Sequence, residues 1–189
     1  MSAAQARNRV RIIGGSWRSR LLRFPDAPGL RPTPDRVRET VFNWLGQDLT
    51  GRNCLDLFAG SGALGFEAAS RNAKHVVMVE SDAHAARVLQ ENAQALAAAA
   101  IHVVRGDALE FLRSDKSAYD VVFLDPPYAK ADRGALLARL RGRMAAGALL
   151  YLESNAPLPA FEGWDVFRQA RAGDVHFQLL HAAGESVTK

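Results

Sequence analysis

From Asn53 onward the sequence alternates between short apolar, strand-like runs and helix-like segments. The strand-like runs are 53–58, 75–79, 101–105, 121–124 and 148–153, and helix-like segments begin near 63, 82, 108 and 132. Such alternation predicts right-handed crossovers and a parallel sheet covered by helices. The end differs, because runs 164–170 and 175–181 flank a Gly-Asp turn and predict an antiparallel hairpin. We therefore expect a doubly wound, Rossmann-like α/β fold, mostly parallel, with an antiparallel C-terminal hairpin.

The first fifty residues do not follow this alternation. Extended runs at 10–13 and 17–22 flank two adjacent glycines and predict a β-hairpin. We therefore divide the chain into an N-terminal hairpin and helix extension, residues 1–50, and a main domain, residues 51–189. We expect the hairpin to be separable, so that removing residues 1–22 leaves the rest folded.

A helix is predicted between the hairpin and the main domain. Thr33 and Pro34 suit the N-cap and the first helical position, respectively. Apolar residues at helical spacing continue the pattern to about Gly46. We expect one face of this helix to pack on the body, with Arg36 and Arg38 on its other faces.

Charge is distributed unevenly along the chain. Residues 1–38 carry nine arginines and two acids, a net charge of +7, which leaves −3 for the remainder of a chain whose total is +4. A basic arm on a mildly acidic body is typical of a nucleic-acid contact. The arginines that we expect to contact RNA phosphates are Arg9, Arg11, Arg18, Arg20 and Arg36. Trp17 lies among them and would either stack on a base or pack against the body.

Composition argues against several other classes of protein. The one cysteine, Cys54, rules out a framework of intrachain disulfides. The five histidines do not pair with Cys or acids at metal-ligand spacing, so we expect no metal site. No window has the apolar length of a membrane span, and the N-terminus lacks the apolar region of a secretory signal. The 189 residues suit one globular body with a sizeable core.

The stretch 120–128 carries the strongest chemical signal. A buried strand should end at Asp125, because Pro126 and Pro127 cannot donate to a sheet ladder. Tyr128 follows directly. A carboxylate, a neighbouring carbonyl and a flat ring at the carboxyl end of a strand could hold a planar group that carries an NH2. In open α/β sheets, ligands bind at that edge.

The segment 60–65 reads Gly-Ser-Gly-Ala-Leu-Gly and lies between a strand and a helix. Taken alone, this spacing predicts a dinucleotide site. Acids near the ends of four successive strands point elsewhere; they are Asp56, Glu80, Asp107 and Asp125. Such a set would repel phosphates and attract the sulfonium and ammonium groups of S-adenosylmethionine. The glycines by themselves do not reject the nicotinamide alternative, in which Glu80 would bind a ribose.

At these residues the chain resembles the class I S-adenosylmethionine-dependent methyltransferases, and more narrowly the RsmD type, which modifies guanine N2 in 16S rRNA. The matching stretches are 11–18, 30–45, 55–65 and 125–128. The last two are shared with many amino-group methyltransferases, whereas the two N-terminal stretches are more specific to this family. The resemblance covers roughly residues 9–155.

The resemblance implies a sheet of about seven strands and methylation of one guanine, of the guanine 966 type, in the small ribosomal subunit. Residues that would hold the methionine part of the cofactor are Asp56, Phe58, Gly60 and Gly62. Glu80 would bind the ribose hydroxyls and Asp107 the adenine amino group. The target base would be held by Asp125 and Tyr128. We further expect the Pro126 carbonyl to accept a hydrogen bond from the amino group of that base. The resemblance also implies a cytoplasmic protein, and we expect a monomer.

Three alternative functions stay open at this point. One is methylation of another amine, such as adenine N6 or a protein glutamine. Another is a nicotinamide-dependent oxidoreductase. The third is an RNA-binding assembly factor without activity.

Overall fold

The computed structural model describes residues 8–27, 30–126 and 132–185. Its centre is a seven-stranded sheet with the spatial order β5-β4-β3-β6-β7-β9-β8. The first five strands in this order are parallel neighbours, and β9 runs antiparallel to both β7 and β8. This confirms the doubly wound α/β fold with an antiparallel C-terminal hairpin. No helix within the three described ranges is both long enough and apolar enough to cross a membrane.

The sheet strands are β3 (Asn53–Asp56), β4 (His75–Glu80), β5 (Ile101–Arg105), β6 (Tyr119–Leu124), β7 (Met144–Ser154), β8 (Trp164–Ala172) and β9 (Val175–Ala182). The helices between them are α2 (Ala63–Ser70), α3 (Ala83–Ala95), α4 (Ala108–Ser114) and α5 (Arg133–Arg141). All these elements match predicted ones, with shifts at the ends. The largest shift is in β7, which begins at Met144 rather than Ala148 and has an irregular register against β6.

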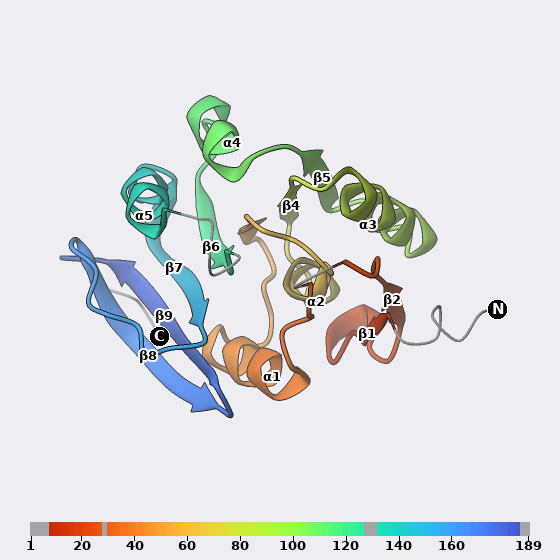
Figure 1. The fold of residues 1–189 in the computed structure, drawn as a ribbon, viewed down its shortest axis with the longest axis horizontal. Coiled ribbons are helices and arrows are strands. Elements are labelled where there is room, and N and C mark those ends of the chain that lie inside the picture. Colours follow the sequence, from red (N-terminus) through yellow and green to blue (C-terminus); the bar gives the residue numbers. More distant parts are fainter. Residues whose placement is uncertain (1–7, 28–29, 127–131, 186–189) are drawn as a thin grey trace.

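Helices pack on both faces of the sheet (Figure 1). One hydrophobic cluster joins α2 and α3 to the sheet and includes Phe66, Leu89 and Phe123. The other lies on the opposite face and joins α4 and α5 to residues such as Leu55 and Leu152. Neighbouring strand residues alternate between the two clusters because successive side chains point to opposite faces. The strands therefore have two buried faces, as a parallel sheet requires.

The N-terminal hairpin is present but is not tightly turned. Its strands are β1 (Arg9–Arg11) and β2 (Leu21–Arg23), and a short 3-10 helix, η1 (Gly15–Trp17), lies between them. Val10 and Leu22 face each other in the ladder and are buried in the same cluster as α2. The prediction that this segment is separable is therefore wrong, because removing it would expose apolar core. Trp17 packs against the same cluster.

Helix α1 (Asp35–Trp44) begins one residue later than predicted. Pro34 occupies the N-cap, and no side chain caps the helix. Thr33 instead accepts a hydrogen bond on its carbonyl from Arg38 Nε at 3.1 Å. Arg38 is fully buried, so placing it on an outer face was wrong, whereas Arg36 is exposed as expected.

The division of the chain into an extension, residues 1–50, and a catalytic domain, residues 51–189, stays a prediction. So does the assignment of RNA contact to the extension. Both parts contribute residues to one core cluster.

Candidate active site

The four predicted acids lie on four adjacent strands at the carboxyl edge of the sheet. Asp56 and Glu80 are the last residues of β3 and β4. Asp107 follows β5, and Asp125 follows β6. Because these strands are neighbours and run in parallel, their ends meet at one edge. The structure therefore brings together the acids that the sequence analysis singled out.

Asp56 and Glu80 hold the glycine loop from two sides. Asp56 Oδ2 accepts from the Gly65 N–H at 3.0 Å, inside the first turn of α2. Glu80 Oε2 accepts from the Gly60 N–H at 2.8 Å, and its Oε1 accepts from the Asp82 N–H at 2.8 Å. Each carboxylate oxygen has more than one lone pair, so Glu80 can still accept from a ligand hydroxyl.

Two glycines of the loop adopt backbone conformations that other residues rarely take. Gly60 has φ +50° and Gly62, the N-cap of α2, has φ +79°. A Cβ added to Gly60 would lie 2.8 Å from Leu30 Cδ1, and one added to Gly62 would collide with Leu89 and Phe66. The loop is therefore closely packed, with its backbone at the edge where the acids meet.

Two further predicted cofactor residues are Phe58, which precedes the glycine loop, and Asp107, which follows β5. Phe58 is half-buried, just beyond β3, and packs against the cluster under α4. Asp107 caps α4, where its Oδ1 accepts from the N–H groups of Leu109 and Glu110. The segment that carries Asp107 is joined to β4, because the Gly106 N–H donates to the Glu80 carbonyl at 3.0 Å.

Burial dominates the electrostatics of the site. Asp56 is almost fully buried, and this desolvation, with a smaller contribution from Glu80, raises its pKa to about 7 against the bond from Gly65. Desolvation also raises the pKa of Asp125, and the nearby charges of Glu153 and Asp56 raise it further. Arg133 opposes that shift only in part. Acids whose pKa is raised in this way favour a cationic ligand, which would stabilise their ionised forms.

Glu153 is a site residue that the sequence analysis did not select. It lies near the end of β7, is buried, and its Oε2 accepts from the Tyr151 hydroxyl at 2.5 Å. Desolvation raises its pKa. The available signal was its place at the end of the fifth parallel strand, one strand beyond Asp125.

The residues predicted to hold the target base are only partly described. Asp125 is partly exposed at the end of β6 and Pro126 is buried. Pro127 and Tyr128 lie outside the described residues.

The five predicted RNA-contacting arginines are all exposed; they are Arg9, Arg11, Arg18, Arg20 and Arg36. The tip of their hairpin, however, lies at the far end of α2. There the Trp17 N–H donates to Ser70 Oγ at 2.9 Å, and Ser70 Oγ donates to the Gly14 carbonyl at 2.6 Å. Eight residues of helix separate this point from the glycine loop, a span of about 12 Å.

A basic residue that the sequence analysis counted but did not select lies closer to the loop. Arg31 is exposed and follows Leu30, whose side chain covers Gly60. Arg31 therefore lies next in sequence to a residue that contacts the glycine loop.

Within the described ranges, no group of three or more His, Cys, Asp or Glu side chains is arranged to hold a metal ion.

Comparison with known proteins gives consistent matches over nearly the whole chain. The family model described as conserved hypothetical protein 95 matches residues 10–181. A ribosomal RNA small subunit methyltransferase D from Escherichia coli is 43% identical over 184 residues, which cover 94% of this chain and 93% of that protein. The protein of the same name from Haemophilus influenzae is 41% identical over 182 residues, 92% of this chain and 94% of its own.

A solved structure shares the fold. It is a putative methyltransferase from Escherichia coli, 41% identical, with a TM-score of 0.83 over 93% of this chain and 98% of that one. The strand order, the acids at the carboxyl edge and these relatives all indicate the same family. The chain therefore belongs to the RsmD family of class I methyltransferases.

Proposed function

We propose that this protein transfers a methyl group from S-adenosylmethionine to the exocyclic N2 of one guanine in 16S rRNA, of the guanine 966 type. The observation that carries the proposal is the acid set at the carboxyl edge, with Asp125 beside a buried proline at the end of β6. The names of the relatives support an rRNA substrate. The family resemblance at residues 11–18 and 30–45 supports guanine N2.

The residues present fit this cofactor. Asp56 is a buried carboxyl with a raised pKa, and a bound cation would stabilise its ionised form. We assign the methionine part to Asp56, Phe58, Gly60 and Gly62. Glu80 would accept from the ribose hydroxyls, and Asp107 from the adenine amino group through Oδ2, since Oδ1 already binds two backbone N–H groups. S-Adenosylmethionine supplies an electrophilic methyl group on a sulfonium.

The protein's contribution to the reaction is chiefly positional. The lone pair of the guanine amino group is delocalised into the ring, so the amine is a poor nucleophile. Asp125 and the Pro126 carbonyl would accept hydrogen bonds from the two N–H groups of the amine. These bonds would turn its lone pair toward the methyl group. Tyr128 would stack on the base. The methylated amine then loses its extra proton to Asp125 or to water.

The target base must leave its stack to reach this edge. The exposed arginines of the hairpin, with Arg31, would hold phosphates along the RNA that leads to the site. Asp125 and the arginines therefore have separate roles. Asp125 selects the amine, and the arginines position the RNA strand.

A labelling experiment tests the proposal. We expect labelled methyl groups to pass from S-adenosylmethionine to 30S particles of a strain that lacks the enzyme, and nucleoside mapping to find N2-methylguanosine. Label in adenine, or in a protein, would replace the proposal with one of the alternative amines. Stabilisation by NAD and not by S-adenosylmethionine in a thermal-shift assay would reject methyl transfer altogether.

A further inference from the structure

Glu153 is a buried carboxyl that has no part in the reaction proposed above. It is the last residue but one of β7, is 5% exposed, and accepts from the Tyr151 hydroxyl at 2.5 Å. The Tyr151 ring is fully buried in the core, where it contacts the rings of Phe123 and Phe177. A ligand therefore has little access to Glu153, and any role that this carboxyl has in the reaction must act through a neighbouring group.

That neighbour is Asp125. Strands β6 and β7 are parallel, and the last pair of their register is Leu124 beside Leu152. One step further along both strands puts Asp125 beside Glu153. Adjacent strands lie about 4.8 Å apart, and residues side by side in a sheet share a face. In agreement with this placement, Glu153 is the charged group that most raises the pKa of Asp125, after the larger effect of desolvation.

Asp125 is also subject to two other charges among the described residues. Asp56 at the end of β3 raises its pKa further, and Arg133 at the start of α5 lowers it in part. Like charges side by side disfavour ionisation, so the Asp125 carboxylate holds a proton more strongly than an isolated one. Because Asp125 is partly exposed, a substrate can use this added basicity directly.

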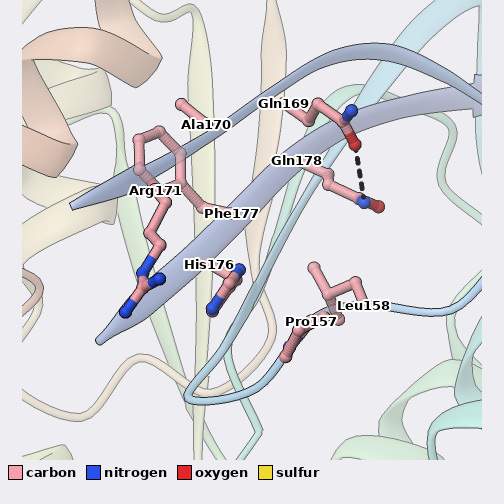
Figure 2. Close-up of a pocket in the computed structure, with 8 residues that line it drawn as sticks. All are labelled: Pro157, Leu158, Gln169, Ala170, Arg171, His176, Phe177 and Gln178. Atoms are coloured by element: carbon pink, nitrogen blue, oxygen red, sulfur yellow. Dashed lines mark hydrogen bonds between the residues drawn. The ribbon is translucent and has the colours of Figure 1, made fainter. Parts of the chain in front are cut away.

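Strand β9 brings no charge to Glu153 on the face that the acids share. The ladder partner of Glu153 on β9 is the apolar Phe177. His176 and Gln178, on either side of Phe177, stand on the opposite face and line a hollow there (Figure 2). Burial raises the pKa of Glu153, and the hydrogen bond from the Tyr151 hydroxyl opposes this effect. Tyr151 therefore favours the ionised form of Glu153, which is the form that repels a charge on Asp125.

We propose that Glu153, held by Tyr151, is a positioning residue that makes Asp125 the proton acceptor of the methyl transfer. The new bond from nitrogen to the methyl group leaves the amine with a positive charge and one hydrogen too many. One N–H bond then breaks, its electron pair stays on nitrogen, and the proton goes to the Asp125 carboxylate. This inference rests on the proposed function, since it takes an amine to be the group that is methylated.

Carbon-13 NMR of the protein alone tests the action of Glu153 on Asp125. Aspartate is labelled at its side-chain carboxyl carbon, and the Asp125 signal is assigned by its loss in Asp125→Asn. In Glu153→Gln, which keeps an acceptor for the Tyr151 hydroxyl, the Asp125 carboxyl should titrate about one pH unit or more below the wild type. Tyr151→Phe is the second variant, should Glu153→Gln fail to fold. It should shift the titration in the same direction, because Glu153 then keeps its proton and no longer repels the charge.

Glu162→Gln is the matched control for these variants. Glu162 is exposed in the loop before β8, so its replacement should leave the Asp125 titration unchanged. An Asp125 titration that is the same in the wild type, Glu153→Gln and Tyr151→Phe would overturn the proposal.

The pH profile of methyl transfer tests the role in the reaction. Single turnovers are measured with labelled S-adenosylmethionine at saturation and 30S particles, and the wild-type rate should rise with pH as Asp125 ionises. Glu153→Gln should move the midpoint of this rise to lower pH and reduce the plateau rate by about threefold, because Asp125 is then a weaker base. A purely structural role would reduce the rate without moving the midpoint, and that result would overturn the proposal. Absence of transfer by the wild type at every pH would instead refute the proposed function, whereas the carboxyl titration does not depend on turnover.

Discussion

Glu67 Oε1 accepts a hydrogen bond from the Gly14 N–H at 2.7 Å, across 53 positions of sequence. The same carboxylate accepts from the Ile13 N–H at 2.9 Å and from the side chains of Arg38 and Arg71. Glu67, Arg38 and Arg71 are all buried. One carboxylate on α2 thus joins the N-terminal hairpin, helix α1 and the helix that begins at the glycine loop.

Replacing Glu67 should destabilise the protein strongly. Each oxygen of Glu67 accepts from one backbone N–H and one arginine. Glu67→Gln would replace one of these oxygens by an amide NH2 and leave its two buried donors unpaired. We expect the free energy of unfolding to fall by about 3–5 kcal/mol in urea titrations. Glu91→Gln, in the exposed pair with Arg87, should cost no more than about 0.5 kcal/mol. Similar losses in both variants would show that the buried network adds nothing to stability.

Removing the Asp125 carboxylate should impair methyl transfer but not the binding of S-adenosylmethionine. Asp125→Ala is expected to retain S-adenosylmethionine in calorimetry, because the assigned cofactor residues on β3 and β4 are untouched. Methyl transfer should fall by about a hundredfold or more. Asp165→Asn, an exposed acid on β8, is the control for loss of charge. Transfer at near-normal rates by Asp125→Ala would reject the proposed role.

The hairpin arginines should affect RNA affinity through salt. Arg9 and Arg11 are exposed, while Val10 between them is buried, so Arg9→Gln and Arg11→Gln should spare the fold. Each substitution is expected to weaken binding to RNA and to reduce the slope of log affinity against log salt by about one. Filter binding at several salt concentrations measures this. Lys116→Gln, exposed between α4 and β6 and away from the hairpin, should leave the slope unchanged, and equal slopes for all variants would remove the hairpin from the interface.

Stability without ligand should depend on pH through Asp56. Its pKa is about 7 in the folded protein against an ordinary value of 3.8. Between these values the folded chain keeps a proton that the unfolded chain has lost, so stability falls as pH rises from about 4 to about 7. Asp56→Asn keeps an acceptor for the Gly65 N–H and removes the titration. The Tm of the wild type should therefore drop more than that of the variant between pH 5 and pH 8, by roughly 4 °C.

Cofactor binding should respond to pH in the opposite sense. Deprotonated Asp56 attracts a cation, so the affinity for S-adenosylmethionine should rise between pH 5 and pH 8 in the wild type and much less in Asp56→Asn. In the stability experiment, parallel Tm curves for the wild type and Asp56→Asn between pH 5 and pH 8 would mean that Asp56 titrates as an ordinary exposed carboxyl.

Many features of the fold and of the candidate site can be predicted from local sequence. Strand and helix periods, the glycine spacing at 60–65 and the acids at strand ends all act over a few residues, and each appears where expected. The parallel order of the strands then brings those acids together without further information. The sheet and the candidate cofactor edge were therefore predictable from the chain alone.

Only the tertiary structure decided which polar residues are buried together. Arg38 looked like one more surface arginine until its partner, 29 positions away, proved to be the buried Glu67. Glu153 became part of the site because β7 lies beside β6. Such pairings join residues that are distant along the chain or lie on different strands. Local sequence marks Glu153 as the end of a strand but does not show which polar groups pair, since the free energy of a buried polar group depends on partners that only the folded chain supplies.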